Sequence, residues 1–258
     1  MKVTVLGCGG SAGVPMIGGD WGACDPNNPR NRRRRASIVI ENGNERLLVD
    51  TPPELHAQLL DAEISLVDAV LYTHFHADHC HGLDNLRAIN HYRGGDLDIF
   101  GDEPTLSELK ERFAYAFLGL PEGAPWFRPS LIPNVVEPGR AFSVGATEIM
   151  PFAQKHGPYQ TIGYRIGYFA YSKDVNELDT NALSTFPNLD TWVVDCVRYA
   201  PSRVHAWLAL TLEWIAHLRP RRAVLTHMAA DFDYDRLSAE LPDGVEPAYD
   251  GMILEIPD

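Results

Sequence analysis

The chain has 258 residues, of which 45% are hydrophobic and 22% charged, the usual balance of a globular protein. Its formal net charge of -13 means that the average field of the protein repels polyanions such as DNA or RNA. A chain of this length can bury a full core without disulfides, and it fits one large domain or two small ones.

Short apolar segments bounded by turn residues predict a strand-rich chain with helices in both halves. The expected strands are 2–6, 37–41, 46–50, 67–74, 97–101, 146–152, 161–172, 191–196, 221–227 and 252–256. The expected helices are 53–60, 82–91, 103–117 and 205–218, and the expected irregular segments are 18–35 and 121–138. No repeat and no linker-like break in composition is visible, so we expect one α/β domain over residues 1–258, with two sheets sandwiched between helices.

The cysteines are scattered along the chain and form no CxxC pair, so we expect free thiols in a reducing compartment. They are Cys8, Cys24, Cys80 and Cys196. The apolar start of the chain is too short for the core of a signal peptide, and no apolar run approaches the ~18 residues of a membrane span. We therefore expect a cytoplasmic protein that does not associate with membranes.

One basic run, Asn31–Arg35, suits either a solvated loop or a small cationic patch that holds a phosphate. In the second interpretation Arg34 and Arg35 are candidate substrate-binding residues, because a guanidinium can donate two parallel hydrogen bonds to phosphate.

The segment THFHADHCHG, Thr73–Gly82, holds four of the 10 histidines. At a strand end, side chains two apart point the same way, so His74 and His76 should share a face while Phe75 points into the core. Asp78 and His79 follow where the chain turns. Crowding these four groups into six residues would be costly without an ion, and imidazole with carboxylate suits zinc, manganese or iron.

Further metal ligands should come from other strand ends, because this short cluster cannot fill two coordination shells. Three polar residues that cap or follow apolar strands are candidates, namely His156, Asp174 and His227.

THFHADH resembles the HxHxDH signature of the metallo-β-lactamase superfamily, and His156, Asp174 and His227 follow in the order in which that superfamily supplies its other ligands. Within the superfamily the chain is most similar to the PhnP-like phosphodiesterase that accompanies the carbon–phosphorus lyase pathway. The similar segments are GCGGSAGVP, LLVD, DHCHGL, VVDC and LTHMAADFD, and ribonuclease Z is a more distant relative. The resemblance covers nearly the whole chain and implies an αββα four-layer sandwich.

The resemblance also implies two divalent ions, which would be zinc or manganese, with iron as a further option. The ions would lie ~3.5–4 Å apart and share a bridging hydroxide. The implied ligands are His74, His76 and His156 for one ion, Asp78, His79 and His227 for the other, and Asp174 as the bridge. Asp78 is thereby also placed in catalysis, and His205 would protonate the leaving group. Asp50 would orient a ligand histidine rather than bind metal. His81 and Cys80 lie outside the signature and receive no metal.

The sequence departs from the PhnP-like pattern at a separate structural zinc site, which uses three cysteines after GVP and a histidine after LTH. Gly19 and Trp21 stand in place of the first two cysteines, and Ala230 stands in place of the histidine. The remaining thiol, Cys24, cannot make a tetrahedral zinc site alone. We expect no structural zinc, and Trp21 should pack the loop instead.

These features predict a hydrolase that acts on a small phosphodiester, such as a cyclic nucleotide or cyclic ribose phosphate, and not on a long nucleic acid. Three alternatives stay open. The first is an RNA nuclease of the ribonuclease Z type, which would want an extended cationic surface. The second is a lactam, lactone or thioester hydrolase. The third is a non-catalytic protein of cofactor biosynthesis that resembles the pyrroloquinoline quinone protein B. The resemblance also allows a homodimer, and the segment 121–138, with Trp126 and Phe127, would be a lid, an interface or cover for the core.

Overall fold

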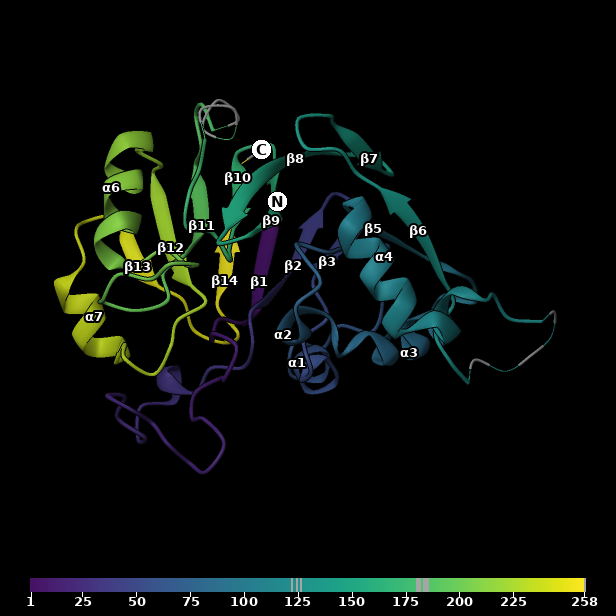
Figure 1. Cartoon of the computed structure of the whole chain (residues 1–258), viewed down its shortest axis with the longest axis horizontal. Coiled ribbons are helices and arrows are strands. Elements are labelled where there is room, and N and C mark those ends of the chain that lie inside the picture. The colour runs from purple at the N-terminus through teal and green to yellow at the C-terminus, as the bar shows by residue number, and fades with distance from the viewer. Residues whose placement is uncertain (122, 124, 126, 180–181, 183–185, 258) are drawn as a thin grey trace.

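Two seven-stranded sheets face each other, and helices cover their outer faces (Figure 1). The computed structural model describes all residues except 122, 124, 126, 180–181, 183–185 and 258. One sheet has the strand order β14-β1-β2-β3-β4-β5-β6 and the other β13-β12-β11-β10-β9-β8-β7. Helices α1 to α4 lie beside the first sheet, and α6 and α7 beside the second. The expected αββα four-layer sandwich is confirmed.

The helices and strands have the following bounds. The strands are β1 Lys2–Gly7, β2 Ser37–Asn42, β3 Glu45–Val49, β4 Ala69–Leu71, β5 Leu97–Gly101, β6 Leu131–Val135, β7 Phe142–Val144, β8 Thr147–His156, β9 Tyr159–Ile166, β10 Phe169–Ser172, β11 Thr191–Asp195, β12 Arg222–Thr226, β13 Val245–Pro247 and β14 Ile253–Glu255. The helices are α1 Leu55–Asp61, α2 Ala77–Cys80, α3 Leu86–Arg93, α4 Glu103–Arg112, α6 Leu208–Leu218 and α7 Tyr234–Glu240. Short 3₁₀ turns lie at Pro29–Asn31, Leu83–Asn85 and Ala114–Phe117.

The alternation of side chains along β3 explains how the first sheet is covered on both faces. Leu47 and Val49 point into the core between the two sheets, whereas Leu48 points into a separate core beneath α1 to α4. All three are fully buried, as expected for a strand with packed layers on both sides. Strands β3, β4, β5 and β6 pair in parallel, so their carboxyl ends meet at one edge of the sheet.

Several expected boundaries are wrong in ways that matter for the site. Strand β8 continues to His156, so this histidine is the last residue of a strand and does not follow it. Helix α6 begins at Leu208, so His205 precedes the helix instead of opening it. The segment 121–138 contains edge strand β6, which tolerates Pro133 because an edge strand has a free side. Trp126 lies outside the described residues.

Candidate metal centre

His74 is fixed at the carboxyl end of β4 by a buried carboxylate. Asp50 accepts hydrogen bonds from the backbone nitrogen and the hydroxyl of Thr73, both at 2.8 Å. The Thr73 carbonyl in turn accepts from the backbone nitrogen of Ile162 at 2.9 Å, which ties the segment to the second sheet. The chain therefore leaves β4 in a defined direction, and the four-residue helix α2 that follows carries Asp78 and His79.

The first group of side chains consists of His74, His76 and His156, whose ligand atoms lie within 4.8 Å of one another. His74 and His156 are buried and His76 is half-buried. His156 donates its Nδ1 proton to the carbonyl of Val204 at 2.5 Å. That hydrogen bond fixes the tautomer, so Nε2 is left with a free lone pair for a metal.

The second group consists of Asp78, His79 and His227, again with ligand atoms within 4.8 Å. Asp174 lies between the two groups. Its Oδ1 is 3.9 Å from Nε2 of both His74 and His156, and its Oδ2 is 3.2 Å from His79 Nε2 and 3.6 Å from His227 Nε2. One oxygen of this carboxylate thus faces each group, as a bridging ligand requires.

The residues of both groups fit divalent ions. Nε2 of His74 and both ring nitrogens of His227 are buried, and within the described residues they make no hydrogen bond. Buried polar atoms without partners are costly, and an ion would satisfy those that face it. The donor set of imidazoles and carboxylates suits zinc, manganese or iron. Asp50, Asp174 and His227 all have positive φ angles, between 53° and 63°, a strain typical of functional sites.

Charges in the metal-free centre are strongly coupled. Burial would raise the pKa of Asp174, but His227, His79 and Lys173 hold it well below its usual range. Burial would lower the pKa of His227, but the carboxylates of Asp174, Asp195 and Asp78 raise it to about 10. Carboxylates that stay ionised are ready to bind a cation.

Metal uptake should therefore release protons. Because the pKa of His227 is about 10, its ring is protonated at pH 7, and a ligand histidine must be neutral. We expect release of at least about one proton per chain at pH 7, and apparent metal affinity should rise with pH until about 10. Calorimetric titration with zinc in buffers of different ionisation enthalpy measures this release. Zero net release at pH 7 would contradict the charge state described here.

Two charged residues of the centre were not predicted from the sequence. Asp195, at the end of β11, is fully buried between Nδ1 of His205 at 3.2 Å and Nδ1 of His227 at 3.5 Å. Lys173 is also fully buried, with its ammonium 2.7 Å from Asp50, 3.3 Å from Asp174 and in contact with His79. Asp195 ends an apolar strand, and Asp174 lies just after one. A polar residue at a strand end is therefore a sequence signal that could have identified Asp195 as part of the centre. Nothing in the sequence marks Lys173, because lysines at strand ends are usually exposed.

The other predicted residues have clear positions. Asp50 lies 3.4 Å from Nδ1 of His79, a suitable place to orient that ring. His205 stacks on the ring of His227 with centroids 4.9 Å apart, and its Nδ1 is 3.7 Å from Asp174. His81 is exposed and contacts Phe113, away from the two groups. Phe75 is only half-buried and lies against Tyr159, so the expectation that it points into the core is wrong.

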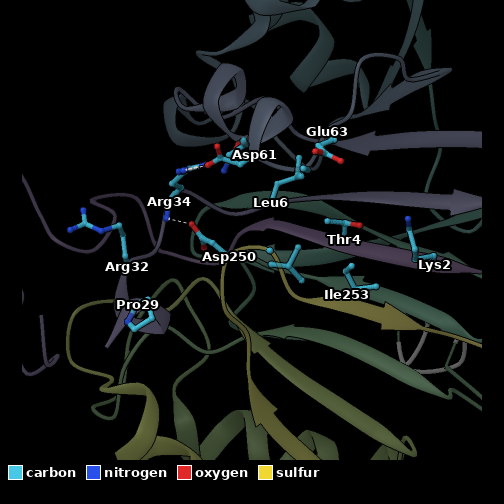
Figure 2. Close-up of a pocket in the computed structure, with 14 residues that line it drawn as sticks. Lys2, Thr4, Leu6, Pro29, Arg32, Arg34, Asp61, Glu63, Asp250 and Ile253 are labelled. Atoms are coloured by element: carbon cyan, nitrogen blue, oxygen red, sulfur yellow. Dashed lines mark hydrogen bonds and ion pairs between the residues drawn. The ribbon is translucent and has the colours of Figure 1, made fainter. Parts of the chain in front are cut away.

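Arg34 and Arg35 are held by carboxylates. Arg34 pairs with Asp61 and lines a separate cavity of about 490 Å³, where its backbone nitrogen also donates to Asp250 (Figure 2). Arg35 pairs with Glu54 at 2.7 Å, and its guanidinium lies about 3.5 Å from the position of a Cβ on Gly13, in the glycine-rich loop. A role for either in substrate binding stays a prediction.

The basic run is not a solvated loop throughout, because Arg33 is buried and binds the carbonyls of Phe232 at 2.7 Å and Ala229 at 3.3 Å. Cys24 lies beside this guanidinium and donates to the carbonyl of Phe232 at 3.2 Å. Trp21 packs against the small apolar cluster that contains Cys24, as expected. One guanidinium and one thiol do not fit a tetrahedral zinc site.

Gly157 joins β8 to β9 and lies close to Val204, the residue before His205. It has a φ of 59°, and a Cβ there would lie 2.6 Å from the side chain of Val204. Gly157→Ala should destabilise the fold by about 1–2 kcal/mol from the left-handed backbone alone, which lowers Tm by a few degrees. Gly95→Ala is the matched control, because open space surrounds Gly95. Equal melting temperatures of the two variants in thermal denaturation would contradict this expectation.

The chain shares its fold and sequence pattern with known proteins. A model described as the beta-lactamase superfamily domain matches residues 45–228, so the chain belongs to the β-lactamase superfamily. Together with the cluster of imidazoles and carboxylates, this makes the domain a metal-dependent hydrolase of the metallo-β-lactamase fold. Within the described residues, no helix is both long and apolar enough to cross a membrane.

Three proteins similar to this chain are a diphosphatase, an octanoyltransferase and a ribonuclease Z. A crystal structure described as a new diphosphatase from the PhnP family is 30% identical, covers 98% of this chain and 97% of that one, and superposes with a TM-score of 0.90. An octanoyltransferase of Porphyromonas gingivalis is 28% identical over 98% of this chain, which spans 51% of that protein. A ribonuclease Z of a Bradyrhizobium species is 27% identical over 53% of this chain, which covers 45% of that protein. The chain thus spans about half the length of these two curated relatives.

Proposed function

We propose that the domain hydrolyses a phosphodiester linkage in a small molecule, with cyclic nucleotides or cyclic ribose phosphates as candidate substrates. The observation that carries the proposal is the position of Asp174, whose two oxygens each face one group of histidines. Two adjacent cation sites that share a carboxylate suit the in-line displacement of phosphate oxygens. The similar diphosphatase of the PhnP family supports phosphorus as the reaction centre.

The proposed roles of the side chains agree with their positions. One ion would be held by His74, His76 and His156, the other by Asp78, His79 and His227, and Asp174 would bridge them. Bound divalent ions supply a water of lowered pKa and positive charge beside the phosphate oxygens. Asp50 and Lys173 contact Nδ1 of His79 and so hold its ring in position.

His205 is the proposed proton donor to the leaving group. It lines the cavity over the two groups, and Asp195 accepts a hydrogen bond from its Nδ1 at 3.2 Å. That bond leaves Nε2 to carry the proton that a departing alkoxide needs. The cavity has a volume of about 260 Å³, which suits a small substrate.

One assay tests the proposal against its alternatives. Protein loaded with zinc or manganese is offered bis(p-nitrophenyl) phosphate, 2′,3′-cyclic nucleotides, nitrocefin, an octanoyl thioester and an unprocessed tRNA. We expect turnover of the first two. Hydrolysis of nitrocefin, thioester or tRNA without any phosphodiester turnover would overturn the proposal.

Hydrolysis of an acyl thioester is the second candidate, because the octanoyltransferase of P. gingivalis matches this chain over 98% of its length. About half of that protein lies outside the match, so its named activity does not by itself assign acyl chemistry to this domain. The thioester in the assay decides between the two candidates directly.

A further inference from the structure

An exposed aromatic ring stands at the mouth of the metal centre. Tyr159, the first residue of β9, is 47% exposed. Its ring lies 5.4 Å from the ring of His76 and 5.6 Å from that of Phe75, and both neighbours stand nearly perpendicular to it. A large aromatic side chain left half in water beside reactive groups is a candidate binding surface.

Contacts with neighbouring side chains hold the ring of Tyr159 in position. Arg112 donates to the carbonyl of Phe75 at 2.6 Å and lies over its ring at 5.4 Å. The rings of Phe75 and His76 both contact Tyr159, and Gly157 and Pro158 form the tight turn just before it. A ring held in this way can bind a flat group with little loss of conformational entropy.

Tyr159 also lies where two cavities meet. The cavity over the metal groups has a volume of about 260 Å³, and a second cavity has about 320 Å³. Pro158 and Tyr159 are the lining residues that the two cavities share among the described residues. The cavity over the metal groups is smaller than the ~300–1,000 Å³ of typical ligand sites. It suits a phosphate and the adjoining sugar, so the rest of a nucleotide would extend across Tyr159.

The chemistry of the second cavity favours a heterocycle over an acyl chain. Its polar lining comes from Gln160 and the Lys155–Glu177 ion pair, whose charged atoms are 2.9 Å apart. Amide and charged groups can bind the polar edge of a base, whereas an octanoyl chain would offer them no hydrogen-bond partner. Base stacking on an aromatic ring tolerates all four bases, because each has a flat face.

We propose that Tyr159 is the stacking platform of a nucleobase subsite, so that this centre binds nucleotides more tightly than base-free sugar phosphates. The inference rests on the proposed phosphodiester hydrolysis for its catalytic meaning, but the binding it predicts is measurable without turnover.

The test compares Tyr159→Ala with Tyr159→Phe, which keeps the ring, in zinc-loaded protein. Binding of adenosine 3′-monophosphate and of ribose 5-phosphate is measured by calorimetry. Tyr159→Ala should weaken binding of the nucleotide by about tenfold or more, the size of one lost base–aromatic stack. Tyr159→Phe should stay within about twofold of wild type, and ribose 5-phosphate should bind all three proteins equally.

Kinetics give a second readout where phosphodiester turnover is found. Tyr159→Ala should raise KM for 2′,3′-cyclic AMP and leave KM for cyclic ribose phosphate unchanged, with kcat conserved. Equal weakening of both calorimetric ligands, or no weakening of either, would overturn the subsite. Stacking in calorimetry without turnover of any phosphodiester would overturn the proposed reaction and leave the nucleobase subsite standing.

Discussion

Asp174→Asn should leave the protein folded but unable to hold two ions at once. The two oxygens of Asp174 face different groups, at 3.2 Å from His79 and at 3.9 Å from His74. An asparagine side chain of the same shape keeps one acceptor oxygen and turns an NH₂ group, which cannot bind a cation, toward the other group. We expect the variant to retain at most one tightly bound ion per chain, measured by elemental analysis after dialysis.

Thermal denaturation gives an independent measure of the same change. Free metal at ~1,000 times its Kd stabilises a folded protein by about 4 kcal/mol, or roughly 8–16 °C in Tm for a chain of this size. Asp174→Asn should lose most of that metal-dependent shift. Asp243→Asn, a substitution on an exposed loop, is the matched control and should keep it. An unchanged metal content in Asp174→Asn would remove Asp174 as the bridge.

The fold and the histidine clusters could be predicted because both depend on local patterns. Buried strands such as β3 are short, apolar and bounded by turn residues, and HxHxDH places four metal-capable groups within six residues. His156, Asp174 and His227 were candidates from their positions at strand ends, and the family resemblance then assigned them to the two ions. The structure brings all seven side chains together.

What the sequence did not predict depends on contacts between distant segments. Lys173 is buried because Asp50, some 120 residues earlier, and the adjacent Asp174 supply the carboxylates that compensate its charge. Phe75 leaves the core because Tyr159 and Arg112 hold it at the rim. Arg33 is buried because its guanidinium donates hydrogen bonds to carbonyl groups in the segment after β12. Periodicity describes a side chain's face on its own element and carries no information about such partners.

The position of Asp195 also bears on catalysis, because it contacts both a predicted metal ligand and the predicted proton donor. Its two oxygens lie 3.5 Å from His227 and 3.2 Å from His205. One buried carboxylate therefore lies beside both rings, which stack on each other with centroids 4.9 Å apart. Asp195→Asn should lower the rate by about 10–100-fold, the usual effect of losing such an orienting partner.

His205→Ala should keep its metal and lose rate only where the leaving group needs a proton. General acids contribute about 10²–10⁴-fold, so hydrolysis of a diester with an alkoxide leaving group should fall by that factor. Hydrolysis of bis(p-nitrophenyl) phosphate should change little, because p-nitrophenolate departs without protonation. The rates are compared across a series of diesters of rising leaving-group pKa, together with metal content.

The dependence of the rate on leaving-group pKa distinguishes a catalytic role of His205 from a structural one. A proton donor makes the wild-type rate nearly independent of leaving-group pKa, and its removal should make the dependence steep. A purely structural role for His205 would lower all rates by the same factor, and that outcome would contradict the assignment. His81→Ala is the matched control, because this histidine is exposed and contacts Phe113 instead of the centre. The rates of this variant should match those of wild type across the series. A loss of rate in His205→Ala alone would then come from the position of His205 beside the metal-ligand groups.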